Sequence, residues 1–223
     1  MTYSGGGDSH ADTRVPIEAL RRLARKPAPP ELVERCELCG VALAPEHRHL
    51  LDRASGTLAC ACSPCALLFE REGAAHGKYL TVPRRTIALD DFQLSAEQWD
   101  DLMIPVNMAF IYVSSVAGRA VAYYPSPAGA TESLLNLEHW VELVQANPIL
   151  TELAPDVEAL LINRVRDAHD VYLVPIDACY QLVGLIRTTW RGLGGGAEVW
   201  TAIAAFFAAL RERAIVVEGG AHA

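Results

Sequence analysis

Four cysteines in the first third of the chain have the spacing of a metal site. Cys36 and Cys39 are separated by two residues and precede Gly40, and Cys62 and Cys65 repeat that gap after 22 further residues. Two thiolates at this spacing can bind one ion, and the glycine lets backbone N–H groups turn toward the sulfurs. The pattern therefore predicts that Cys36, Cys39, Cys62 and Cys65 are metal ligands.

Zinc is the metal that this ligand set favours. Four thiolates suit a tetrahedral ion, and closure by four protein ligands is typical of a structural site. Residues 31–76 have too few large apolar side chains for a core of their own. Bound zinc supplies about 10–16 kcal/mol of folding free energy in small metal modules. We expect structural zinc, with iron as the alternative metal and a metal-free dithiol pair as the remaining hypothesis.

Three neighbouring residues leave the ligand set open. Cys60 lies two residues before Cys62 and could replace it, lie beside the ligands or only pack. His47 and His49 lie between the two cysteine pairs, and either could replace one cysteine. An ordinary polar or capping role is the simpler interpretation of both histidines. All three residues gain importance if the site is redox-active or catalytic.

Cys179 is a candidate of another kind, a cysteine nucleophile. It lies near the start of an expected helix, where a thiolate would be stabilised, and His169 and Asp177 are near it in sequence. Cysteine is also among the residue types that are most often buried. Packing in the core is therefore the favoured interpretation.

Two further segments have features of binding loops. Arg191–Gly196 is rich in glycine and could hold an anion on free N–H groups. It lacks the Lys-Ser/Thr ending of a P-loop, which favours a turn between helices. Tyr124–Glu132 contains Pro125 and Pro127. We expect it to be a stiff exposed loop and a candidate surface for a protein partner.

The composition restricts the class of protein. The chain has 223 residues, 51% of them hydrophobic, and a net charge of -8 from 27 acidic and 19 basic residues. That charge argues against nucleic-acid binding, which needs clustered Lys and Arg. No apolar run approaches the roughly 20 residues that a membrane span needs, and residues 1–12 lack the apolar segment of a secretory signal. We expect a cytoplasmic protein, without a membrane partner, whose cysteines are reduced.

The overall pattern predicts an α+β fold in which an N-terminal zinc-knuckle module packs on a mixed α/β domain with a helical C-terminal end. The expected divisions are a flexible tail at 1–13, a helix plus the zinc-knuckle module at 14–76, the mixed domain at 77–215 and a tail at 216–223.

Expected strands are Thr86–Leu89, Val171–Val174 and a hairpin of Met108–Val116 with Arg119–Tyr124, which Pro125 ends. Expected helices lie near Ser95–Leu102, after an N-cap at Asn136, from Pro155 to Val165, after an N-cap at Asp177, and over Val199–Leu210.

Several motifs together resemble an uncharacterised bacterial family, a domain of unknown function. The resemblance covers residues 31–213 and is carried by Cys36–Gly40, His47–Asp52, Cys60–Phe69, Tyr124–Gly129, Asp156–Leu161, Pro175–Arg187 and Trp190–Gly196. Members of that family are often encoded beside high-affinity nickel-iron hydrogenase genes and a NifU-like protein. The resemblance implies an accessory, maturation or electron-handling role, and it assigns no residues beyond the cysteine cluster.

Two hypotheses of function follow. The first is a zinc-binding accessory protein, not an enzyme, that assists the assembly, maturation or docking of a metalloenzyme such as a nickel-iron hydrogenase. The second is a small redox or electron-transfer protein that uses an iron or dithiol centre at the same cysteines. A zinc-dependent regulator of transcription is disfavoured by the negative charge.

Overall fold

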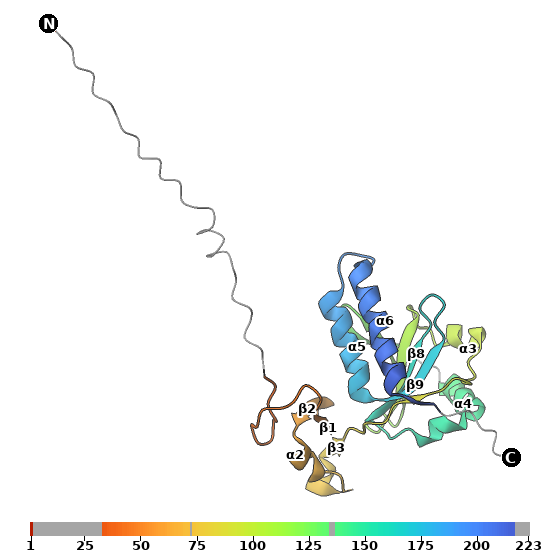
Figure 1. Cartoon of the computed structure of the whole chain (residues 1–223). Coiled ribbons are helices and arrows are strands. Elements are labelled where there is room, and N and C mark those ends of the chain that lie inside the picture. The colour runs from red at the N-terminus through yellow and green to blue at the C-terminus, as the bar shows by residue number, and fades with distance from the viewer. Residues whose placement is uncertain (2–32, 72, 134–136, 217–223) are drawn as a thin grey trace. The chain divides into compact units, whose positions relative to one another are not determined.

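The structure, a computed structural model, describes residues 1, 33–71, 73–133 and 137–216 (Figure 1). The chain divides into two units, Met1–Val33 and Glu34–Ala223, and every element named below belongs to the second. The expected tail at 1–13 apart from Met1, the helix expected at the start of the 14–76 division and the N-cap at Asn136 lie outside the described residues. So does the expected C-terminal tail, apart from its first residue.

Among the described residues, seven strands form one large sheet in the order β10-β4-β9-β8-β5-β6-β7. Neighbouring strands are antiparallel except β10 and β4, which are parallel. This arrangement confirms the predicted mixed α+β class. The strands are β4 (Ile87–Ala88), β5 (Met108–Ser114), β6 (Arg119–Ser126), β7 (Gly129–Ser133), β8 (Glu158–Asn163), β9 (Asp170–Pro175) and β10 (Ile215–Val216).

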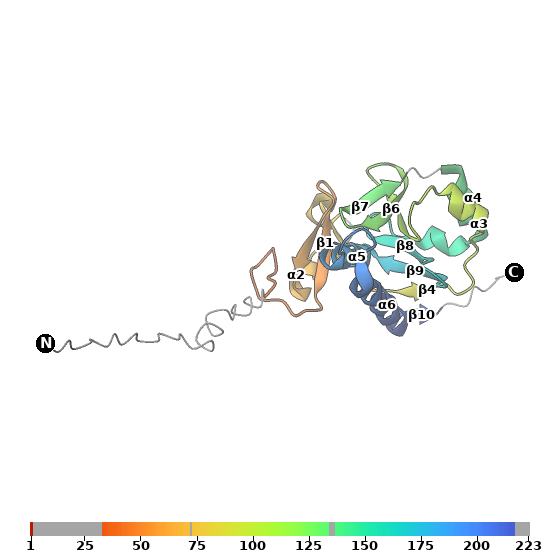
Figure 2. The same cartoon turned by 90° about the horizontal axis from the view of Figure 1, so that it is seen from above.

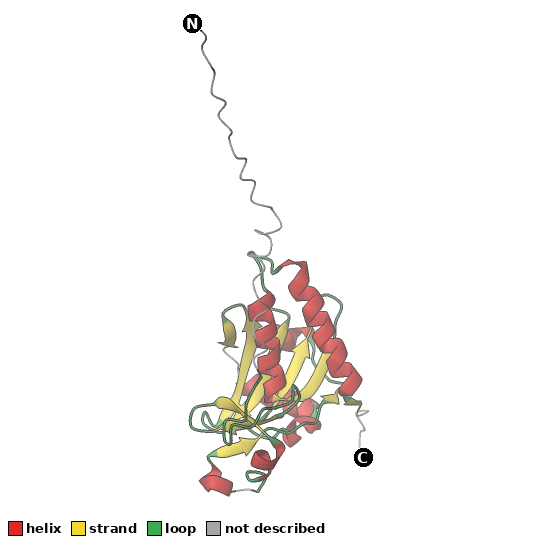
Figure 3. Cartoon of the chain, turned by 60° about the vertical axis from the view of Figure 1, so that its left-hand side comes forward, coloured by secondary structure: helices red, strands yellow, loops and turns green. Residues whose placement is uncertain are grey.

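Helices cover both faces of this sheet, as Figure 2 shows. On one face lie α5 (Ile176–Thr189) and α6 (Gly196–Arg213), which run side by side (Figure 3) and share a buried cluster with alternate residues of β5, β8 and β9. On the other face lie α3 (Ala96–Asp101), α4 (Leu137–Ala146) and the short 3₁₀ helix η2 (Pro148–Glu152). The central strands are therefore buried on both sides.

The helix expected from Pro155 to Val165 was wrong, because this segment forms the strand β8. All six residues of β8 are buried, Ala159 and Leu161 in the cluster under α5 and α6 and Leu160 and Ile162 in the opposite cluster. A strand that is buried on both faces has no alternation of apolar and polar residues. Its short apolar run cannot be distinguished from a buried helix by periodicity alone.

The strand expected to end at Pro125 continues to Ser126, and the expected stiff loop at Tyr124–Glu132 is a hairpin of β6 and β7. Pro125 pairs with Ala130 of β7, whereas pairing of β6 with β5 ends at Tyr123. At Pro125 the strand therefore has a partner on one side only, where the missing N–H of proline is tolerated.

Several local predictions are confirmed. The helix expected near Ser95–Leu102 is α3, and the predicted hairpin is formed by β5 and β6. The structure adds that Ser95 caps α3 through a reciprocal hydrogen-bond pair with Gln98. The apolar stripe from Val199 to Leu210 is buried along α6. The cap of α5 differs from the prediction, because Pro175 occupies the N-cap position and Asp177 lies in the first turn.

A smaller sheet carries the cysteine segments. Its antiparallel strands are β1 (Arg48–Asp52), β2 (Thr57–Ala61) and β3 (Tyr79–Thr81), in the order β2-β1-β3; α2 (Ser63–Leu67) follows β2, and η1 (Ala74–Gly77) precedes β3. Its own buried cluster is small and contains Cys36, Leu50, Ala61 and Ala66. Leu51 and Val82 instead belong to the cluster of α5 and α6. The small sheet therefore packs against the main core.

The turn between α5 and α6 depends on Gly195. This residue has a φ of +81°, and a Cβ atom there would lie 2.8 Å from Cγ1 of the buried Val199 and 3.1 Å from the ring of Trp190. We expect Gly195→Ala to lower the free energy of unfolding by about 2–5 kcal/mol, because a left-handed φ costs about 1–2 kcal/mol and overpacking costs about 1–3 kcal/mol. Urea unfolding measures this change.

Gly194→Ala is the matched control. A Cβ atom at Gly194 would meet no atom within 4 Å, and its φ lies outside the left-handed region. Its effect on the free energy of unfolding should stay within about 0.5 kcal/mol. Equal losses of stability in the two variants would contradict the role given to Gly195.

Candidate metal centre

The first cysteine pair lies in a tight turn. The N–H of Cys36 donates to the carbonyl of Val41 at 2.9 Å, and the N–H of Gly40 donates to the carbonyl of Cys36 at 2.7 Å. Gly40 has a φ of +75°, a left-handed conformation that glycine adopts without steric cost. The turn brings Cys36 and Cys39 to the same side of the chain, as the sequence pattern predicted.

The second cysteine pair lies at the start of α2. Cys62 is the N-cap residue of this helix, Pro64 lies in its first turn, and Cys65 follows one residue later. The helix begins at Ser63. Proline at this position costs no hydrogen bond, because the first N–H groups of a helix have no partner within it. The short helix directs both cysteines toward the first pair.

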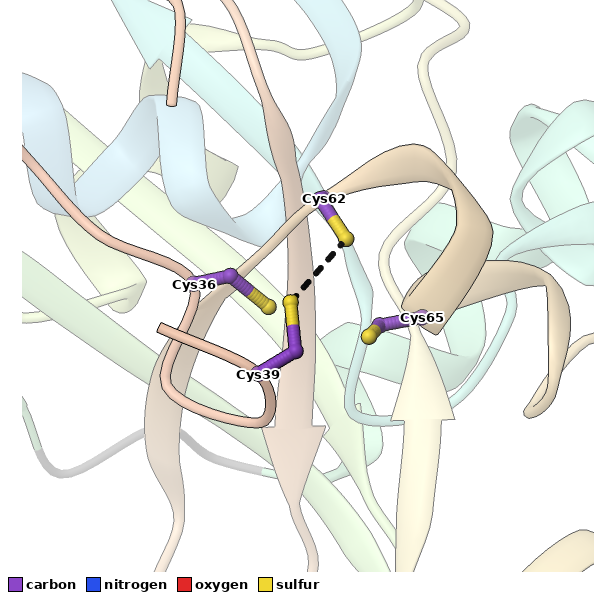
Figure 4. A group of neighbouring side chains, drawn as sticks. All are labelled: Cys36, Cys39, Cys62 and Cys65. Carbon is purple, nitrogen blue, oxygen red and sulfur yellow. Dashed lines mark hydrogen bonds between the residues drawn. The ribbon is translucent and has the colours of Figure 1, made fainter. Parts of the chain in front are cut away.

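The four sulfurs converge on a single point, as Figure 4 shows. The Sγ atoms of Cys36, Cys39, Cys62 and Cys65 all lie within 4.8 Å of one another, and those of Cys39 and Cys62 are 3.7 Å apart. A tetrahedral ion with metal–sulfur bonds of about 2.3 Å would separate its sulfur ligands by about 3.8 Å. The donor set and its spacing therefore fit one tetrahedral metal ion.

The thiols of this cluster differ in their tendency to ionise. Burial raises the pKa of Cys36, but backbone N–H groups of Cys62, Leu38 and Cys39 lower it to a net value of about 6. Hydrogen bonding with the Cys62 thiol raises the pKa of Cys65 to about 12. Neighbouring thiols cannot all be thiolates without a positive charge among them. A bound cation provides that charge and ionises the sulfurs that it contacts.

Cys60, His47 and His49 lie outside this four-sulfur group. They form a second group, in which one ligand atom of each residue lies within 4.8 Å of the others. Sequence reasoning considered each of these residues as a replacement ligand or, more simply, as a residue that packs beside the site or has an ordinary polar role, and it did not group the three together. It also missed Asp177, whose Oδ2 lies 2.8 Å from Nδ1 of His49 across 128 residues of sequence. No local pattern could have indicated a contact between β1 and α5.

Cys179 is a residue of the core. It is fully buried within the cluster of α5 and α6, and burial raises its pKa well above the ordinary value. His169 is exposed, and the carboxylate of Asp177 contacts His49. These findings support the packing interpretation that the sequence favoured.

Arg191–Gly196 joins α5 to α6, as predicted for a turn between helices. The indole N–H of Trp190, at the end of α5, donates to the carbonyl of Gly192 in this turn at 2.8 Å. A cleft of about 620 Å³ lies along β9 and α6 and is lined by neither cysteine nor histidine. Arg211 at its edge donates to Asp90 Oδ2 at 2.8 Å, so two of its charges neutralise each other.

Comparison with known proteins places the chain in a family. Residues 35–214 match DUF5947, a family of unknown function, and the chain belongs to this family. The match confirms the resemblance to an uncharacterised domain that the sequence motifs indicated. No curated protein and no solved structure matches the chain. None of the helices in the described ranges is long and apolar enough to cross a membrane.

Substitution of a single cysteine tests the four-sulfur centre. We expect Cys39→Ser and Cys65→Ser each to hold one metal ion per chain fewer than the wild type, because a hydroxyl is a much poorer ligand than a thiolate. Plasma mass spectrometry of the anaerobically purified variants gives the metal content. Cys179→Ala is the control, since Cys179 belongs to neither ligand group, and it should keep the wild-type content. Unchanged metal in both serine variants would contradict the assignment.

Proposed function

We propose that this DUF5947 protein is a zinc-binding accessory protein that docks to a metalloenzyme or to its maturation machinery. The observation that carries the proposal is the closed group of four cysteine sulfurs. Four protein ligands leave a tetrahedral ion no position for substrate, which is typical of a structural role. The nickel-iron hydrogenase is the candidate partner that the sequence resemblance implies.

A bound ion would supply stabilising interactions that the cysteine segments lack. Among the residues that the structure describes, Leu50 is the one large aliphatic side chain buried in the small cluster around the cysteines, and Leu43 packs against it only partly buried. A tetrahedral ion would join the turn at Cys36–Gly40 to the start of α2, two segments on opposite sides of the β1–β2 hairpin in sequence. Metal binding would therefore hold the shape of this surface rather than perform chemistry on it.

Exposed apolar side chains on the same segments provide a candidate docking surface. Leu38 and Val41 flank Cys39 and are 41% and 51% exposed, and Leu67 and Leu68 follow Cys65 and are 59% and 69% exposed. Each of the four lies within three residues of Cys39 or Cys65 in sequence, and exposed apolar side chains around one site are candidates for a protein contact. We define Leu38, Val41, Leu67 and Leu68 as the apolar rim.

The redox hypothesis remains the second candidate, and one observation favours it. Cys39 is exposed, so an ion held by the four sulfurs would lie close to solvent. That position suits electron transfer to a partner. Metal analysis distinguishes the two functions, because zinc gives no visible colour, whereas iron bound by four thiolates absorbs visible light. About one iron per chain with a visible band would replace the accessory role by electron transfer.

Docking through the apolar rim is tested with the purified nickel-iron hydrogenase as the probe. We expect Leu67→Asp and Leu68→Asp each to weaken binding at least about 10-fold, because burial of a leucine contributes about 1.5–3 kcal/mol. Biolayer interferometry with the full chain gives the dissociation constants. Val116→Asp is the matched control, since Val116 is 83% exposed on the β5–β6 turn, outside the rim. Equal weakening by all three variants, or no binding by the wild type, would contradict docking through the rim.

A further inference from the structure

His47, His49 and Cys60 lie together beside the β1–β2 hairpin. His49 and Cys60 are directly opposite each other in the antiparallel register, and His47 immediately precedes the first residue of β1. The rings of the two histidines have their centroids 4.7 Å apart. One ligand atom from each of the three residues lies within 4.8 Å of the other two.

Hydrogen bonds determine which nitrogen of each ring is free. Nδ1 of His47 lies 2.9 Å from the carbonyl oxygen of Ala44, and Nδ1 of His49 lies 2.8 Å from Oδ2 of Asp177. Carbonyl and carboxylate oxygens only accept hydrogen bonds, so Nδ1 carries the proton in both rings. In the neutral imidazoles Nε2 then presents a lone pair, which is the form that binds metal.

Nε2 of His47 is a buried nitrogen without a hydrogen-bond partner. The His47 side chain is only 6% exposed, so water does not readily replace the missing partner. An unpaired buried polar atom is unfavourable and usually indicates a function or a bound species. A metal ion contacting this nitrogen would remove the penalty.

The surroundings of the three residues have the form of a metal site. Metal-binding histidines usually donate their other N–H to a carboxylate or a backbone carbonyl, which orients the ring. Asp177 serves His49 in this way, and Ala44 serves His47. The backbone at Cys60 is also fixed, since its N–H donates to Glu37 Oε1 at 2.8 Å and its carbonyl accepts from the N–H of Glu37.

We propose that His47, His49 and Cys60 form a second metal site, distinct from the four-cysteine centre, for a late first-row divalent cation such as Zn²⁺ or Co²⁺. Two imidazoles and one thiolate are the soft and intermediate ligands that these ions prefer. Three protein ligands leave a tetrahedral ion one open position for water or an added ligand. The first centre has its own four sulfurs, so both sites can be filled at once.

The same residues also suggest a second arrangement, a cysteine–histidine–aspartate triad of Cys60, His49 and Asp177. That arrangement assigns no role to His47, whose Nε2 would remain buried and unpaired. The metal site accounts for both histidines and for the carboxylate. The proposed ion also differs from the structural zinc in having an open position, so this inference does not depend on the docking function.

Cobalt titration of the reduced, full-length chain tests the second site, since Co²⁺ bound by thiolates absorbs visible light. We expect two cobalt ions per wild-type chain and one per chain of Cys60→Ser or His47→Ala. His169→Ala is the matched control, because His169 is exposed and belongs to neither ligand group, and it should bind two. Saturation of the wild type at one cobalt would overturn the proposal, and so would two ions bound by Cys60→Ser.

Asp177→Asn keeps the result interpretable if substitution of a ligand unfolds the hairpin. An amide preserves the size of the carboxylate but orients and polarises the His49 ring less well. Loss of such an outer partner typically weakens metal binding 10–100-fold. We therefore expect the second site of Asp177→Asn to compete 10–100-fold less well with a chelating dye for cobalt than the second site of the wild type does. The affinity of the four-cysteine site for cobalt should stay unchanged. If each of the two sites binds cobalt with the same affinity in Asp177→Asn as in the wild type, the carboxylate has no role in metal binding. That result would overturn the proposed second site.

Discussion

Burial of the large sheet on both faces is the constraint on which the rest of the structure depends. β5, β8 and β9 lie at its centre, and their alternate residues enter two separate apolar clusters. One cluster requires α5 and α6, and the other requires α3, α4 and η2. Because apolar burial is the main favourable term in folding, these helices and the sheet stabilise one another. The same packing fixes the first turn of α5, where Asp177 lies.

The small sheet takes its position from this core and its local shape from the cysteine segments. Leu51 and Val82 extend from it into the cluster of α5 and α6, while its own buried cluster has few large side chains. A module with so little apolar burial needs another source of cohesion. The four converging sulfurs provide a place for an ion that would serve this purpose, and this supports the proposed structural role of zinc.

The hairpin of β1 and β2 connects the two ligand groups. Its end leads into Cys62 and α2, and its paired residues His49 and Cys60 form the centre of the second group. The hydrogen bond from His49 to Asp177 links this hairpin to α5. If both groups hold metal as we propose, the four-cysteine site would maintain the shape of this surface. The second site would hold an ion beside it with one position open to an exchangeable ligand. Such a pairing would suit a protein that assists a metalloenzyme.

Local sequence patterns were sufficient to predict the structure where the interactions that determine it are also local. The two cysteine pairs fit a turn and a helix start, Ser95 and Gln98 form a capping box, and the stripe on α6 is buried as its periodicity indicates. In each case the interacting residues lie within a few positions of one another, or they recur along one face of a helix. The sequence by itself therefore determined the mixed fold class, the grouping of four cysteines and the C-terminal helix.

Tertiary packing decided the rest. Residues 158–163 form a strand and not part of a helix because layers on both sides bury them, a condition that no local pattern records. Cys60 stands apart from the four sulfurs because the strand register places it opposite His49. Asp177 does not cap α5, because the helix begins at Ile176 with Pro175 as its N-cap, and the Asp177 carboxylate contacts His49 of β1. These outcomes depend on contacts between residues distant in sequence, and only the folded chain brings such residues together.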